Sequence, residues 1–114
     1  MNGKAPERKK LIYICAPLKG NVERNVARAR MFCGTVINMG EIPVSAHVMF
    51  DGILHDEIPK ERETALSIGL ELVKHCDELW IFSKTVSEGM QAEIDIAAEC
   101  GITVKNFFEQ DGRA

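Results

Sequence analysis

Two short, uninterrupted apolar runs constrain the fold of this chain more than any other feature. Leu11–Cys15 reads LIYIC and Leu79–Phe82 reads LWIF, with no polar residue inside either run. A strand with one face in water alternates apolar and polar residues, so these runs are typical of strands buried on both faces of a parallel sheet. Such a sheet needs helices on both sides, and the sequence has room for them.

Three segments have the apolar spacing of helices. The first spans about 22–39, with apolar residues at intervals of three and four and Gly40 as its stop. The second begins with a proline and runs over about 59–75, and the third runs from Gly89 until Gly101 ends it. Each helix therefore lies between two candidate strands.

Two further strands complete the expected sheet. One is Ile42–Val44, leading through His47 into Val48–Phe50, and the last lies around Ile102–Val104. Strands and helices alternate from end to end. We therefore expect an α/β protein: a doubly wound parallel sheet, Rossmann-like or flavodoxin-like, of four to five strands flanked by helices.

Composition narrows the class of protein. The chain has 114 residues, 27% charged residues and a net charge of −3, which fits one globular domain and offers no basic field for a nucleic-acid duplex. We expect the domain to span residues 11–107, between a flexible flank of residues 1–10 and a tail of residues 108–114. No apolar run has the length of a membrane span and no signal peptide is recognisable, so the cytoplasm is the expected compartment.

The cysteines indicate neither a disulfide framework nor a metal site, and two pairs of apolar residues suggest self-association. The four cysteines are widely spaced beside apolar segments, which favours reduced core thiols over a disulfide framework or a zinc site. Neither a metal nor an organic cofactor is indicated, and GxGxxG and GxxxxGK[ST] motifs are absent. The apolar pairs Met31–Phe32 and Phe107–Phe108 favour a subunit interface, so we expect a homodimer or a higher homo-oligomer.

Glu93 is the most informative single residue. On a wheel of the last helix it falls inside the apolar arc, between the directions of Ala97 and Cys100, whereas Asp95 and Glu99 fall opposite. A carboxyl group on the core-facing side needs partners, and such groups are often functional. The alternative is that Glu93 lies at the border of the arc and bends its stem to solvent.

The expected topology brings three connecting segments to one edge of the sheet. Cys15–Asn21, Ser45–Asp51 and Ser83–Gly89 all leave strands at their carboxyl ends, where doubly wound sheets bind ligands. Glycines for close backbone approach, a hydroxyl for a helix start and a positive charge would suit a sugar phosphate there: Gly20, Gly89, Ser87 and Lys19.

The motifs YICAPLKG, a strand ending in His47, CDELWIF and SEGMQAE occur in that order. Together they resemble the nucleoside 2-deoxyribosyltransferase superfamily, most closely its branch of 2'-deoxynucleoside 5'-monophosphate N-glycosidases and related small phage and bacterial proteins. The resemblance covers the chain from Tyr13 to about Val104.

The resemblance implies a role for each matching residue. Glu93 matches the nucleophile, Asp77 an aspartate that handles the leaving base or orients the site, and Tyr13 a tyrosine that positions the sugar or the glutamate. His47 matches a histidine of the pocket wall. The remaining positions of the implied substrate-binding set are Ala16, Pro17, Lys19, Gly20, Ser87, Gly89 and Met90.

Two positions depart from the monophosphate-cleaving branch. Pro17 stands where that branch has a serine, and Lys19 where it has an arginine, so a point charge replaces a bidentate fork. Other interpretations of the matching residues also stand: Asp77 as a helix or turn cap, Tyr13 as a core aromatic, and His47 as a hydrogen-bonded wall residue.

The resemblance implies cleavage of an N-glycosidic bond in a nucleoside or nucleotide. A carboxylate beneath C1' can stabilise an oxocarbenium-like transition state and then trap the sugar covalently, which gives retention. The alternative is a non-catalytic nucleotide-binding or sensing module that uses the same cleft. A weaker third reading is an interaction protein with a vestigial cleft.

Overall fold

Four parallel strands form the sheet of the computed structural model, which describes residues 8–107. The strands follow the spatial order β2-β1-β3-β4, with β1 and β3 in the centre. Their bounds are Leu11–Cys15 for β1, Ile42–Val44 for β2, Glu78–Ile81 for β3 and Thr103–Asn106 for β4. The predicted α/β class and the parallel sheet are confirmed, with four strands in the described part of the chain.

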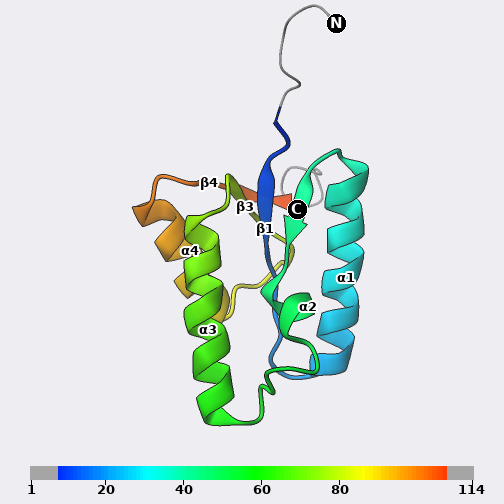
Figure 1. The fold of residues 1–114 in the computed structure, drawn as a ribbon, viewed down its shortest axis with the longest axis vertical. Helices are drawn as coiled ribbons and strands as arrows, with labels where there is room; N and C mark the ends of the chain where they lie inside the picture. The colour runs from blue at the N-terminus through cyan, green and yellow to red at the C-terminus, as the bar shows by residue number, and fades with distance from the viewer. Residues whose placement is uncertain (1–7, 108–114) are drawn as a thin grey trace, which may run out of the picture.

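Helices cover both faces of this sheet (Figure 1). Helix α1 lies on one face, and α3 and α4 lie on the other, while the short α2 lies beside the edge strand β2 and contacts both α1 and α3. Their bounds are Val22–Asn38 for α1, Ala46–Phe50 for α2, Pro59–Lys74 for α3 and Glu88–Glu99 for α4. Each of the three long helices lies within about a residue of its predicted span.

The central strands are buried on both faces, as their uninterrupted apolar runs predict. On the α3 and α4 side, Tyr13 and Cys15 of β1 pack in one cluster with Met90 of α4. On the α1 side, Ile12 and Ile14 pack in a second cluster around Phe82. Because side chains alternate along β1, this one strand supplies residues to both halves of the core.

The second strand has its predicted bounds, Ile42–Val44. Its expected continuation to His47 is wrong, because His47 lies on α2. The buried Ser45 is the cap of that helix, and its Oγ accepts a hydrogen bond from the N–H of Val48 at 3.3 Å. Helix α2 therefore begins directly after β2, and it contacts both α1 and α3.

Phe32 and Phe107, one phenylalanine from each apolar pair, pack against the core cluster around Phe82. The rings of Phe32 and Phe107 both stack on Phe82, with centroids 4.6 Å and 4.8 Å away. Phe32 and Phe107 are half-buried and Met31 is 70% exposed, so an interface at these pairs stays a prediction; Phe108 lies outside the described residues. Self-association stays a prediction.

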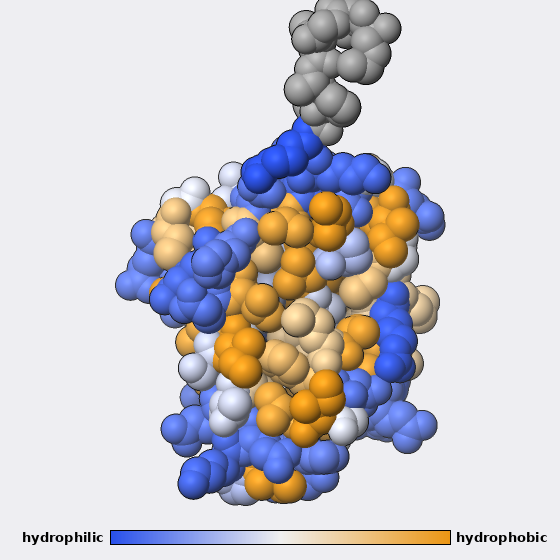
Figure 2. Space-filling view, viewed as in Figure 1, coloured by the Kyte–Doolittle hydropathy of each residue, from blue (hydrophilic) through white to orange (hydrophobic). Residues whose placement is uncertain are grey.

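One surface of the protein is nonetheless rich in apolar side chains. Figure 2 shows a broad apolar area between α1 and α3, over β2 and α2. Ile42 of β2 and Met49 of α2 are among the exposed large apolar residues, at 41% and 50% exposure. Within residues 8–107, no helix combines the length and the apolar character that crossing a membrane requires.

Candidate functional site

Helix α4 holds Glu93 in its second turn with the side chain directed into the core. Ser87 begins the helix, and its Oγ accepts the N–H of Met90 at 3.3 Å. Glu93 is 7% exposed, so its carboxyl does not reach solvent along the border of the helix. A buried carboxyl group needs hydrogen-bond partners.

Tyr13 is the closest partner of this carboxyl. Its hydroxyl donates a hydrogen bond of 2.6 Å to Oε2 of Glu93, and the tyrosine itself is 1% exposed. The thiol of Cys15 also lies against the carboxyl, and its Sγ is 3.7 Å from the carbonyl oxygen of Met90. The three groups form a polar cluster inside an apolar layer.

Burial dominates the electrostatics of the cluster. It raises the pKa of Glu93 to about 7, although the hydrogen bond from Tyr13 and the nearby thiol of Cys15 favour the ionised form and act in the opposite direction. Burial and the nearby Glu93 carboxyl also raise the pKa of the Tyr13 hydroxyl and of the Cys15 thiol, which both stay protonated donors. Glu93 is thus the group of this cluster that titrates near neutral pH.

Helix α3 closes over the pair through Gly69. A Cβ added at Gly69 would lie 3.2 Å from Oη of Tyr13 and 3.4 Å from Oε2 of Glu93. Ala46, the first residue of α2, is the next neighbour, with its Cβ 3.9 Å from that position. Gly69 is not among the residues predicted for the site, although a glycine inside an otherwise regular helix can mark a close packing contact.

His47 joins α2 to the residue that follows β1 through a hydrogen bond. Its Nε2 lies 2.7 Å from the carbonyl oxygen of the buried Ala16. Burial lowers the pKa of His47, although the Ala16 carbonyl and Asp56 act in the opposite direction, so the ring is neutral at pH 7 and Nε2–H donates this bond. This contact places His47 beside the strand that carries Tyr13.

The loop after β1 is held against the start of α1. Pro17 is half-buried, whereas Lys19 and Gly20 are exposed, and Gly20 has a φ of 105°, which favours glycine. Asn25 donates from Nδ2 to the carbonyl oxygen of Leu18 at 2.9 Å. The loop therefore presents Lys19 and Gly20 to solvent at the carboxyl edge of the sheet.

The start of α4 lies at the same edge but presents fewer side chains than expected. Ser87 and Gly89 are exposed, whereas Met90 is 2% exposed and packs in the core on the α3 and α4 side. Ser87 already accepts the Met90 N–H, so its hydroxyl serves the helix as a cap.

Asp77 lies at the opposite, amino edge of the sheet. Its Oδ2 accepts the N–H of Leu11, the first residue of β1, at 2.7 Å, and its Oδ1 pairs with Arg8 at 3.1 Å. The structure therefore does not bring Asp77 together with Glu93. These contacts give Asp77 a part in anchoring the first strand.

The neighbouring Glu78 is a second buried carboxylate that the sequence analysis missed. It is 7% exposed, accepts a hydrogen bond from Nε1 of Trp80 at 2.8 Å, and pairs with Lys10 at 3.0 Å and Lys105 at 3.2 Å. Burial raises its pKa, but the bonds from Trp80, Lys10 and Lys105 outweigh burial and leave the pKa below its usual value. Glu78 is therefore an ionised structural group whose charge is balanced by Lys10 and Lys105, unlike Glu93.

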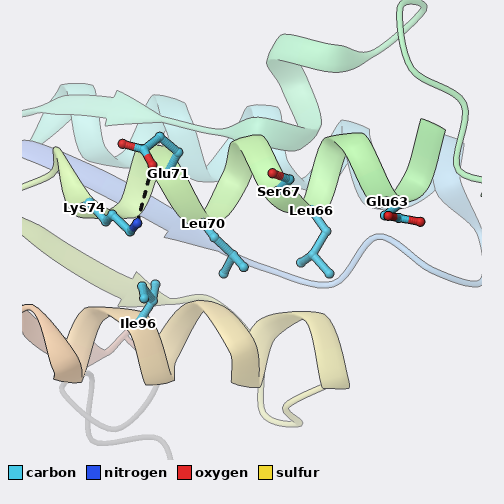
Figure 3. Close-up of a pocket in the computed structure, with 7 residues that line it drawn as sticks. All are labelled: Glu63, Leu66, Ser67, Leu70, Glu71, Lys74 and Ile96. Atoms are coloured by element: carbon cyan, nitrogen blue, oxygen red, sulfur yellow. Dashed lines mark hydrogen bonds and ion pairs between the residues drawn. The ribbon is translucent and has the colours of Figure 1, made fainter. Parts of the chain in front are cut away.

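A hollow of about 390 Å³ lies away from this cluster, between α3 and α4. Figure 3 shows Leu66 and Leu70 pointing from α3 toward α4, and Ile96 pointing back from α4. Its charged lining residues, Glu63, Glu71 and Lys74, are all exposed and include no buried carboxyl group, so we place the candidate site at Glu93 and not here. Among residues 8–107, no three His, Cys, Asp or Glu side chains are grouped so as to hold a metal ion.

Comparison with solved structures supports the fold. A 2-deoxyribosyltransferase from the psychrotolerant bacterium Bacillus psychrosaccharolyticus superposes with a TM-score of 0.65. The match covers 84% of this chain and 70% of that one, at 14% sequence identity. The chain thus has a deoxyribosyltransferase-like fold.

Comparison at the level of sequence gives the family. No curated protein matches the sequence significantly. Residues 10–107 match the model of the family described as "Domain of unknown function (DUF7768)", and the chain belongs to that family.

Proposed function

We propose that this protein cleaves the N-glycosidic bond of a nucleoside or nucleotide, as an N-glycosidase or a deoxyribosyltransferase, with Glu93 as the nucleophile. The observation that carries the proposal is the buried Tyr13–Glu93 pair, in which a carboxyl with a pKa of about 7 accepts a 2.6 Å hydrogen bond. The deoxyribosyltransferase-like fold supports the same reaction class.

In the proposed reaction, an oxygen of ionised Glu93 bonds to C1' while the bond from C1' to the base nitrogen breaks. The bonding electrons leave with the base, which takes a proton from water. Positive charge develops on the sugar ring and a nearby carboxylate stabilises it. Water or a second base then displaces Glu93 from C1', so two inversions give overall retention.

Tyr13 positions the nucleophile in this scheme. Its hydroxyl fixes one carboxyl oxygen, Oε2, and favours the ionised form that the reaction needs. A pKa of about 7 leaves Glu93 about half ionised at neutral pH. Asp77 has no part in the scheme because it lies at the other edge of the sheet.

The second candidate function is a nucleotide-binding or sensing module without turnover. It is favoured by the low exposure of Glu93, 7%, which leaves little of the carboxyl for a substrate to approach. Under this alternative the same carboxyl edge binds the ligand, and Glu93 serves the packing of α4.

A chromatographic assay for free base distinguishes the two. The purified protein is incubated with deoxynucleosides, ribonucleosides and their 5'-monophosphates, with and without an acceptor base. Glu93→Gln keeps the shape of the side chain but removes the nucleophile, and Glu99→Gln on the exposed face of α4 is the matched control. We expect base release by the wild type and Glu99→Gln and none by Glu93→Gln.

The outcomes separate the proposals. Release that persists in Glu93→Gln contradicts the nucleophile assignment. If no substrate releases base but a nucleotide raises the melting temperature, the result contradicts the enzyme proposal and supports the binding module.

A further inference from the structure

Gly69 is the one glycine of α3 and lies in the interior of that helix, where it is buried. A glycine in a helix interior is less stable than alanine because it loses more backbone freedom on folding. A glycine here therefore needs a reason in the packing. The contacts of the absent Cβ give one, since its nearest neighbours are the Tyr13 hydroxyl and the Glu93 carboxyl.

These neighbours have little room to move. Tyr13 is 1% exposed and its ring is enclosed by the core, so its hydroxyl cannot swing into solvent. A Cβ at 3.2 Å from Oη is closer than ordinary van der Waals contact, whereas 3.4 Å from Oε2 of Glu93 is tolerable. A methyl group at Gly69 would thus act first on the hydroxyl that donates to Glu93.

We propose that Gly69 is a positioning residue: its missing side chain lets the backbone of α3 pack directly on the Tyr13–Glu93 hydrogen bond and hold that bond short. The effect of Gly69 on catalysis rests on the proposed function, in which Glu93 is the nucleophile. The geometry that carries it, a 2.6 Å bond beneath a helical glycine, is independent of turnover. Gly69→Ala lengthens the hydrogen bond from Tyr13 to Glu93. The weaker bond then stabilises the ionised form of Glu93 less.

The test combines Gly69→Ala with Tyr13→Phe, which removes the hydroxyl and with it the closest contact of the new methyl group. Gly34→Ala is the matched control, because Gly34 lies inside α1 and an added Cβ there meets nothing within 4 Å. Helix propensity alone predicts a higher melting temperature for Gly34→Ala. We expect a lower one for Gly69→Ala, and a gain from the same substitution in the Tyr13→Phe background.

The second readout is the titration of Glu93, followed by NMR in protein labelled with carbon-13 at the glutamate carboxyl groups. Loss of a hydrogen bond to the charged form raises the midpoint, by about one to two pH units for Tyr13→Phe. Gly69→Ala should shift it in the same direction by less, and should add nothing in the Tyr13→Phe background. Gly34→Ala should leave the midpoint unchanged.

These measurements need no turnover, so the two proposals can fail separately. If Gly69→Ala leaves the Glu93 midpoint unchanged or stabilises the protein as Gly34→Ala does, the positioning role is wrong, whatever the base-release assay shows. If the midpoint shifts as expected but no substrate releases base, Gly69 positions the pair and the proposed reaction fails. Where turnover is found, the acidic limb of the kcat profile should move upward with the midpoint.

Discussion

The hydroxyl of Tyr13 donates a 2.6 Å hydrogen bond to Oε2 of Glu93, and this bond joins the middle of β1 to the second turn of α4. A carboxyl group in this setting is stable as the neutral acid, because burial opposes its ionisation. The pair therefore links the stability of the protein to pH.

Glu93→Gln should stabilise the protein at alkaline pH. The pKa of Glu93 in the folded state, about 7, lies above the unfolded value of 4.5. The folded state thus binds the proton more tightly, and the stability that this gives is present below pH 4.5 and lost as pH rises through 7. Glutamine stays neutral at every pH. The free energy of unfolding of the variant, relative to that of the wild type, should therefore be roughly 3 kcal/mol higher at pH 8 than at pH 4.

Urea unfolding at a series of pH values measures this difference. Glu99→Gln, on the exposed face of α4, serves as the control and should show no such trend. A difference between Glu93→Gln and the wild type that stays constant from pH 4 to pH 8 would contradict the assigned pKa.

Glu78→Ala should act in the opposite pH direction. The pKa of Glu78 lies below its usual value, so its contribution to stability is present above the unfolded pKa and lost as pH falls through the folded one. At pH 7 the variant leaves the Nε1–H of Trp80 without its acceptor, which costs about 2 kcal/mol. Thermal unfolding should show that the loss shrinks on acidification, and an equal loss at pH 3 and pH 7 would refute it.

The strands and long helices could be predicted because local patterns determine them. Leu11–Cys15 is buried on both faces, and an uninterrupted apolar run reports that directly. Glu93 was found for a related reason, since the wheel of one helix reveals a charge on its apolar side.

The features that sequence reasoning missed depend on contacts between distant segments. Gly69 meets Tyr13 and Glu93 only once α3 has packed over β1 and α4, and no local pattern shows that approach. At His47, the apolar residues that follow favoured a strand, whereas the capping hydroxyl of Ser45 begins a short helix.

Asp77→Asn tests whether the geometry or the family resemblance assigns this residue correctly. Asparagine can still accept the N–H of Leu11, so we expect unchanged turnover and at most a small loss of stability. If Asp77 instead handled the leaving base, kcat would fall by about 10²- to 10⁴-fold. Steady-state kinetics on the substrate found by the base-release assay decides between these results, and Glu99→Gln again provides the unaffected reference.

Lys19→Ala tests recognition of a 5'-phosphate, for which the exposed loop after β1 supplies a positive charge beside Gly20. A single solvated lysine offers modest attraction, so KM for a 5'-monophosphate should rise about fivefold while KM for the matching nucleoside stays unchanged. Because salt screens exposed charges, the difference should diminish at high ionic strength. Lys74→Ala, near the end of α3 and paired with Glu71 at 3.5 Å, is the charge-matched control and should leave both KM values unchanged. Equal increases for nucleoside and monophosphate would mean that Lys19 supports the loop and not the phosphate.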